Sequence, residues 1–467
     1  MPHEHSKSSR TTQSIPEIMS TLANVEKPRI DESETYILRL PNELLSKILD
    51  LTFDTERPYD AFWFTPRAHP VTAGLSRVCR GFEASVTPKL YSELDIVSSV
   101  TKNVHADEST TLLYRTLEKN STKRTYCRKL AISLVKESEP EFDPSANLLD
   151  STFDVIRWLS STTHLSITGI RTTSQDVDSP NLHTLISRAL NLLPRLMTLR
   201  IYGKTVSLPT VLEGLGDMTK YHTNLSALII YYINEAANTS QWQALQGIKG
   251  TAPMTKLKLK RFGQTPEVLE ALIKWPIELQ KLSFRPQCAW STGHSGLFDN
   301  WSFAVMQPIL EAQMANLREL SILDLDTGDI KNLDLTSFKK LEVLKLPSTL
   351  TGYDKEDVSR LVSPNLRVFK WKVVTWNSEV EEQVDDFGQV QEDWIHELVK
   401  VAIERKVKLR EVFVKFTPII LGNIDHRSIY PWDRISNVAR HSEQHGIQIH
   451  HSPPTISRDE FRGISVL

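Results

Sequence analysis

The chain has 467 residues, a hydrophobic fraction of 40% and a formal net charge of −2, from 55 basic and 57 acidic residues. This composition excludes a mostly disordered chain, and the length suits roughly two to four compact domains or one long repeat array. The balanced charge gives no overall reason to expect nucleic acid or an anionic membrane as a partner.

Cysteine usage and hydropathy set the expected compartment. Cys79, Cys127 and Cys288 are far apart in the sequence, so they form no C-x-x-C metal or redox pair. A disulfide framework is therefore not expected, which favours the cytoplasm, the nucleus or both. The N-terminal residues lack the apolar core of a signal peptide, and no apolar run of about 18 residues predicts a membrane span.

The first structured region is predicted to follow a polar, aperiodic tail at residues 1–35. Apolar residues then recur at helical spacing, with Pro41 in the first turn: Leu40, Leu44, Leu45, Ile48 and Leu49. Residues 54–74 contain three prolines and several aromatic residues, which predicts an ordered loop or insertion. A second helix face follows at Leu75, Val78, Cys79 and Phe82, and "KLYSELDIV" leads into a predicted strand.

A short template, apolar-x-x-apolar-x-apolar, recurs along the rest of the chain. Its copies begin at residues 127, 163, 196, 225, 254, 279, 317, 341, 366 and 409, with a possible last copy in "HGIQIHH". Helical patterns such as "PEVLEALIKWP" lie between the copies. Strand plus helix at about 20–29 residues is the range of leucine-rich repeats, and the wider, irregular spacing here indicates repeats with insertions.

The alternative interpretation of these repeats is a doubly wound α/β sheet, because its strands also alternate with helices. Buried parallel strands tend to be continuously apolar, whereas this template alternates, and open sheets rarely exceed about ten strands. We therefore predict an α/β chain with a helical domain at 36–97 followed by an irregular leucine-rich-repeat-like solenoid at 98–455 and a C-terminal tail at 456–467.

The two N-terminal segments, "LPNELLSKILDLTF" and "LSRVCRGFEASVTPKLYSELDI", together resemble an F-box, with the "TPKLY" ending found in fungal members. The insertion at 54–74 departs from the short linker of that family. The resemblance implies a small helical module that docks onto a Skp-type adaptor and, through it, a cullin-RING ubiquitin ligase. It implies adaptor contacts at Leu40, Pro41, Leu44, Leu45, Ile48, Leu49, Leu75, Val78 and Phe82.

In such repeats the residues between the leucines point away from the core, because side chains alternate along a strand. Many of these positions are basic, and two are tyrosines. We predict that a target protein with an acidic or phosphorylated segment binds there. The predicted contact residues are Arg200, Tyr202, Tyr231, Lys258, Lys260, Arg285, Lys345, Lys370 and Lys372. Two alternatives stay open: lysines that serve solubility alone, and a self-inhibitory contact from the acidic segment at 378–393.

The sequence has no G-x-S-x-G, P-loop or H-E-x-x-H motif. His441 and His445 are four residues apart, as helical metal ligands would be, but a solvated terminal helix is the favoured interpretation. We therefore predict a non-catalytic substrate-recognition subunit of an SCF-type (Skp–cullin–F-box) ligase without metal or cofactor. The alternatives are a leucine-rich-repeat scaffold that acts outside a ligase and, less favoured, an enzyme with an unrecognised site.

Overall fold

The computed structural model divides into two compact units, Met1–Val86 and Thr87–Leu467. The structure describes residues 40–41, 43–45, 47–48, 51, 80–99, 108–135, 149–168, 180–203, 208–215, 224–233, 247, 249–287, 298, 300–326, 328–373, 387–416 and 429–464. The predicted tail at 1–35, the insertion at 54–74 and the first part of the acidic segment, 378–386, lie outside these ranges.

In the first unit, the described residues from Glu43 to Leu51 are helical. The backbone N–H groups of Leu44 and Leu45 both donate to the carbonyl of Pro41 at 3.0 Å, which places the start of the helix where the sequence predicts it. The next described helix is α4 (Arg80–Leu90), in which Phe82 and Val86 are buried.

Among its described residues, the second unit contains one parallel sheet of 12 strands. The strands are β1 (Glu93–Ser99), β2 (Lys129–Val135), β3 (His164–Thr168), β4 (Thr198–Tyr202), β5 (Ala227–Ile233), β6 (Lys256–Phe262), β7 (Lys281–Pro286), β8 (Glu319–Ile322), β9 (Val343–Pro347), β10 (Val368–Val373), β11 (Glu411–Phe416) and β12 (Gln448–His451). Each strand pairs with its neighbours in sequence, and the order never reverses. A doubly wound sheet requires such a reversal, so the sequence prediction of a solenoid is confirmed and the alternative is excluded.

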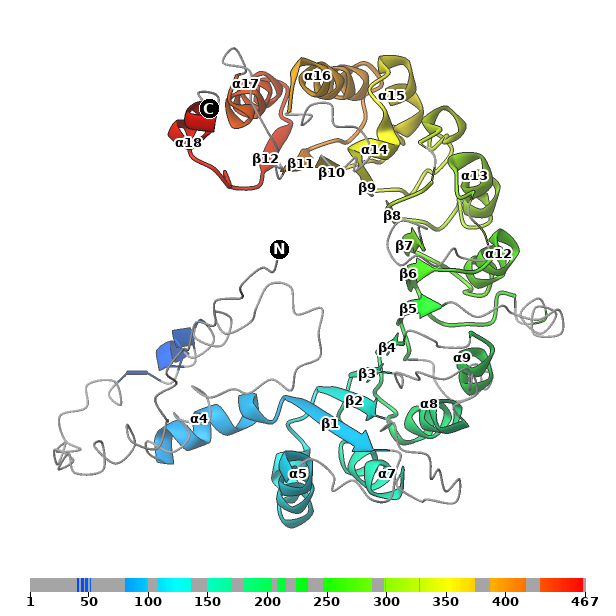
Figure 1. The fold of residues 1–467 in the computed structure, drawn as a ribbon, viewed down its shortest axis with the longest axis vertical. Coiled ribbons are helices and arrows are strands. Elements are labelled where there is room, and N and C mark those ends of the chain that lie inside the picture. The colour runs from blue at the N-terminus through cyan, green and yellow to red at the C-terminus, as the bar shows by residue number, and fades with distance from the viewer. Residues whose placement is uncertain are drawn as a thin grey trace, which may run out of the picture. The chain divides into compact units, whose positions relative to one another are not determined.

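Helices fill the connections between the strands. They are α5 (Glu108–Lys119), α6 (Ser121–Arg124), α7 (Leu149–Trp158), α8 (Pro180–Leu192), α9 (Leu208–Leu215), α12 (Pro266–Lys274), α13 (Phe303–Glu311), α14 (Ser348–Thr351), α15 (Lys355–Leu361), α16 (Gln389–Glu404), α17 (Pro431–Glu443), α18 (Arg458–Ile464) and the 3₁₀ helix η4 (Ile330–Asn332). Within residues 87–467, the longer helices lie on the outer side of the curved sheet and the strands line its inner side (Figure 1).

The repeated template explains the register of the sheet. The first leucine of each L-x-L motif occupies one continuous row across β1 to β9, from Leu94 to Leu344, and Phe369, Val412 and Ile449 continue that row. These side chains are buried against the helices. A one-residue slip would turn the whole row to the other face, so burial holds the register.

Local signals begin the connecting helices. The Ser302 hydroxyl accepts a hydrogen bond from the backbone N–H of Val305 and caps α13, and the Asp354 carboxylate accepts one from Glu356 and caps α15. Pro266 occupies the first turn of α12, where its missing N–H costs nothing.

Aromatic side chains fill the space between sheet and helices in the later repeats. Trp371 and Trp394 stack with ring centroids 4.7 Å apart, and the Trp371 indole N–H donates to the Thr351 hydroxyl at 3.1 Å. Trp301 packs edge-on against Phe284. Trp301 and Trp371 are both buried, so they serve packing.

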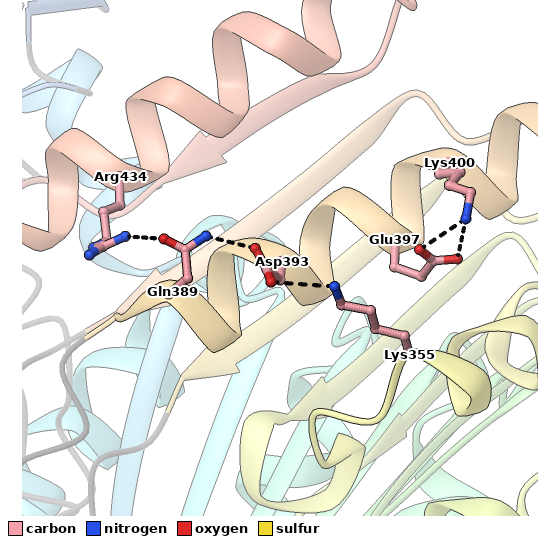
Figure 2. Close-up of polar contacts among 6 residues, drawn as sticks. All are labelled: Lys355, Gln389, Asp393, Glu397, Lys400 and Arg434. Atoms are coloured by element: carbon pink, nitrogen blue, oxygen red, sulfur yellow. Dashed lines mark hydrogen bonds and ion pairs between the residues drawn. The ribbon is translucent and has the colours of Figure 1, made fainter.

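Polar contacts join the outer helices near the C-terminal end of the solenoid (Figure 2). Gln389 in α16 accepts a hydrogen bond from Arg434 in α17 at 3.0 Å and donates one to Asp393 at 2.7 Å. The Lys355 ammonium pairs with the same Asp393 carboxylate at 3.3 Å. The hydrogen bond from Gln389 and the nearby lysine lower the pKa of Asp393.

The segment set apart as a C-terminal tail contains α18, in which Phe461 is buried and packs edge-on against Tyr430. Among the described residues, no helix combines the length and the apolar character that a membrane span requires. Cys127 is a buried free thiol whose pKa is raised to about 11, mainly by burial, so it is a packed side chain rather than a nucleophile.

Candidate binding face of the sheet

The predicted target-binding residues all lie on the inner face of the sheet, defined here as the face opposite the helices. Two rows run across the strands on this face. The central row includes Arg200, Ile229, Lys258, Ser283, Ser321, Lys345, Lys370, Phe413 and His450. A parallel row, two residues further along each strand, includes Tyr202, Tyr231, Lys260, Arg285, Pro347, Lys372 and Lys415.

The first group of basic residues, the β6 cluster, consists of Arg200, Lys258 and Lys260. The rings of Tyr202 and Tyr231 stack beside this cluster with centroids 4.1 Å apart and planes inclined by 15°. The Lys260 ammonium lies 5.1 Å from the centroid of the Tyr231 ring, a cation–π contact that orients the lysine.

The second group, the β10 cluster, consists of Lys345, Lys370, Lys372 and Lys415. The Lys370 ammonium lies 5.4 Å from the centroid of the Phe413 ring. Phe413 in turn stacks on His450 at 4.7 Å. Each basic cluster therefore has an aromatic pair on the side away from the other cluster. Sequence reasoning did not include His450, because it lies in the weakest copy of the template.

Like charges and partial burial act on the lysines of both clusters. The pKa of Lys258 falls to about 8 because burial disfavours its charge, and Lys260, Lys256 and Arg200 add repulsion. The pKa of Lys345 is also lowered, first by burial and then by Lys370, Lys372 and Lys415. An anion on this face would relieve that repulsion, so the electrostatics favour a negatively charged partner.

The strands between the two clusters carry charges that neutralise one another. Lys281 in β7 pairs with Glu319 in β8 at 3.0 Å. Arg285, which the sequence predicts as a target contact, forms an ion pair with Asp324, just after β8. The structure thus divides the predicted basic contact residues into two clusters, and Arg285 belongs to the neutral region between them. The sequence does not reveal these pairs, because each partner comes from the next repeat.

The predicted adaptor contacts separate by exposure. Leu44 is 50% exposed and Ile48 43% exposed, whereas Leu45 and Phe82 are 5% and 4% exposed. Leu45 and Phe82 therefore serve the core and offer no surface for an adaptor in this structure. Leu40 is half-buried and Pro41 is exposed. Leu49, Leu75 and Val78 lie outside the described residues.

One exposed residue was missed. Leu51 is 63% exposed and continues the helical spacing of Leu44 and Ile48 at i, i+4 and i+7. These three residues, called the apolar strip below, lie on one side of the helix. The signal in the sequence was the i+7 spacing, although Leu51 is not among the adaptor contacts that the resemblance implies.

The histidines singled out in the sequence lie on the outer helices. The centroid of the His441 ring lies 5.1 Å from that of His396 and 5.5 Å from that of His445. They line a groove of 550 Å³ together with Lys355, Asp393 and Glu397. Burial, followed by the charge of His441, lowers the pKa of His396. Within the described ranges, no three His, Cys, Asp or Glu side chains are placed to share a metal ion.

Comparisons with known proteins bear on the fold alone. No family model matches the sequence. No curated protein matches it either. Among solved structures, the leucine-rich repeat-containing protein LegL7 from Legionella pneumophila has 13% identity and a TM-score of 0.41, over 75% of this chain and 98% of that chain. A protein from Bacteroides fragilis has 11% identity and a TM-score of 0.31, over 77% of this chain and 74% of that chain. The assignment of a strand–helix solenoid rests on the strand order and register described above.

Proposed function

We propose that the chain is a non-catalytic protein-binding subunit that joins an adaptor to a target protein. The inner face of the sheet, with its two basic clusters, binds the target. The observation that carries this half of the proposal is the gathering of partly buried lysines on one face, because burial and mutual repulsion disfavour their charges and an anionic partner would relieve the repulsion. Repeat solenoids offer extended surfaces of this kind for binding.

The apolar strip on the N-terminal helix supports the adaptor half of the proposal. Leucine and isoleucine side chains exposed at one side of a helix are what a hydrophobic groove recognises. Burial of each of these side chains in an interface contributes about 1–2 kcal/mol. Together with the F-box-like motif, the strip supports a role as a substrate-recognition subunit of an SCF-type ubiquitin ligase.

Co-purification with a Skp-type adaptor tests this assignment. The wild-type chain is expected to retain the adaptor, and the double variant Leu44→Ala/Ile48→Ala is expected to lose it. Leu45 is unsuitable for this test because its loss would disturb the core. Leu112→Ala is the matched control, since Leu112 is 54% exposed in α5 of the second unit. An adaptor that binds both variants equally well, or never binds the wild type, refutes the ligase assignment.

The second candidate is a leucine-rich-repeat scaffold that acts outside a ligase. The observation in its favour is that the binding face belongs wholly to the second unit, Thr87–Leu467, and does not require the N-terminal helix. Under this alternative, Lys258→Glu/Lys260→Glu abolishes capture of target proteins, while no Skp-type adaptor accompanies the chain.

A further inference from the structure

The two basic clusters on the inner face are discrete binding points. Lys258, Lys345, Lys370 and Lys372 form no ion pair among the described residues. On the strands between the clusters, the central row holds Ser283 and the buried Ser321, neither of which carries a charge. The charged residues that flank these serines are held in the pairs Lys281–Glu319 and Arg285–Asp324. A ligand anion therefore finds a free cation at β6 and at β9–β10, and carboxylates in between.

The register of the sheet sets the distance between these points. Lys258, Ser283, Ser321 and Lys345 follow one another in the central row on β6 to β9. Neighbouring strands are about 4.8 Å apart, so three steps span about 14 Å. An extended peptide advances about 3.3 Å per residue, and four residues cover about 13 Å. Because side chains alternate along an extended segment, a spacing of four also keeps both side chains on the same side.

The aromatic pairs define the ends of the array. Tyr231 lies one strand before Lys260, and Phe413 lies one strand after Lys370. From β5 to β11, the inner face thus carries an aromatic residue, a basic group, neutral serines, a second basic group and a second aromatic residue. Apolar residues outside the two anionic positions of a ligand would contact these rings.

We infer that the inner face binds an extended protein segment that crosses the strands and carries two anionic side chains four residues apart. Lys258 and Lys260 bind one anionic side chain, and Lys345 and Lys370 bind the other. This inference rests on the proposed target-binding role of the face and adds the chemistry and spacing of the target. Phosphorylated and acidic residues share this chemistry, and the test below separates them.

A protein segment fits this face better than a nucleic acid does. A nucleic acid carries a phosphate at every nucleotide and favours a continuous basic track. Here such a strand would bring phosphates against the carboxylates of Glu319 and Asp324, between the clusters. A peptide can place neutral residues there.

Binding of synthetic peptides to the full-length chain, measured by fluorescence anisotropy at constant salt, tests the inference. The probes are 13-residue peptides with two phosphoserines at spacings of two, three, four or eight, in otherwise degenerate neutral sequence. Matched probes carry one phosphoserine, or two glutamates at a spacing of four. The doubly phosphorylated probe with a spacing of four is expected to bind about tenfold more tightly than the single-phosphate probe. Equal binding of the glutamate probe assigns acidic residues, and weaker binding assigns phosphate.

Two variants test the two points separately. Lys258→Gln and Lys345→Gln are each expected to reduce binding of the double-phosphate probe to the level of the single-phosphate probe, and the double variant to abolish it. Lys331→Gln is the matched control, because Lys331 is exposed in η4, among the helices on the other side of the sheet. Thermal unfolding midpoints within about 2 °C of wild type show that the variants fold.

The outcomes separate this inference from the proposed function. Peptide affinity that is independent of the second phosphate, or of the spacing between the two, overturns the two-point inference. If Lys258→Gln still weakens peptide binding in that case, the proposed anion-binding role of the inner face stands. Tighter binding of a 12-nucleotide single strand than of every peptide also overturns it. If neither variant changes binding of any probe or capture of target proteins from cells, the inference and the target-binding role both fail.

Discussion

Tyr202 and Tyr231 stack face to face across β4 and β5, with their ring centroids 4.1 Å apart. The pair lies beside the β6 cluster, and burial, together with a hydrogen bond between the two tyrosines, raises the pKa of Tyr231. The aromatic pair therefore stiffens the face at the point where Lys260 rests on it.

Replacement of Tyr231 should weaken both the sheet and the β6 cluster. Tyr231→Ala is expected to lower the free energy of unfolding by about 1–3 kcal/mol, since the residue is half-buried and stacked. Tyr231→Phe keeps the stack and should cost no more than about 1 kcal/mol. Denaturant unfolding measures both values. Equal effects of the two variants would show that the stack contributes nothing.

Anion binding by the β6 cluster should depend on pH well below the range of an ordinary lysine. Because the pKa of Lys258 is lowered to about 8, its charge is complete below about pH 7 and is lost between about pH 7 and 9. Affinity for the doubly phosphorylated peptide should therefore fall over that interval, in which the phosphates stay fully charged. Lys258→Gln should reduce this fall in affinity between pH 7 and 9, and a pH-independent wild type contradicts the prediction.

Rising pH should have the opposite effect on the stability of the fold, which is expected to increase while peptide affinity falls. A folded-state pKa below the unfolded value means that the Lys258 charge disfavours the fold. This penalty is complete below about pH 8 and disappears as pH rises toward the ordinary lysine value of 10.5. The stability gap between wild type and Lys258→Gln should accordingly narrow above pH 8, as measured by denaturant unfolding.

The Trp371–Thr351 hydrogen bond should be a sensitive point of the core. Thr351→Val leaves the buried Trp371 N–H without its hydroxyl partner and is expected to cost about 1–3 kcal/mol. Trp371→Ala also removes the stack on Trp394 and should cost about 3–5 kcal/mol. Since repeats contact mainly their neighbours, hydrogen exchange should rise first in β9 to β11. A uniform rise across all strands would contradict neighbour-limited coupling.

Two ion pairs on α16 should differ in strength because they differ in exposure. Arg434 and Glu392 are 2.8 Å apart, with side chains only 17% and 15% exposed, whereas Lys355 and Asp393 are 55% and 41% exposed. Arg434→Ala is expected to cost about 1–3 kcal/mol, and Lys355→Ala no more than about 0.5 kcal/mol. Denaturant unfolding at 0.1 and 1 M salt checks this, because only the exposed pair should be screened.

The strands could be predicted from the sequence because one pattern reports both burial and register. Each L-x-L pair, such as Leu257 and Leu259, must turn its leucines to the helices, and the residues between them then face the other way. The prediction of the inner-face residues, Lys258 included, follows from the same alternation. The order of the strands could be predicted too, because in a solenoid each new strand pairs with the free edge of the strand from the preceding repeat.

The neutral region between the clusters could not be predicted. The partner of Arg285 is Asp324, which lies beyond the end of its strand with a backbone φ of 55°, outside the repeating pattern. Helical spacing likewise placed Leu44 and Leu45 together, although their exposure differs tenfold, at 50% and 5%. The spacing of apolar residues predicts which side of a helix is apolar. Only the packing of the fold decides which residues on that side are buried.

The continuous central row of the sheet makes it a molecular ruler. Any two side chains in one row are separated by a whole number of strand spacings, so the length that a ligand must have is counted in repeats. Removal of one repeat between β6 and β9 would bring Lys258 and Lys345 closer by about 4.8 Å, without altering either cluster. Insertions in the connections between strands leave this measure unchanged, which explains how repeats of such unequal length share a single face.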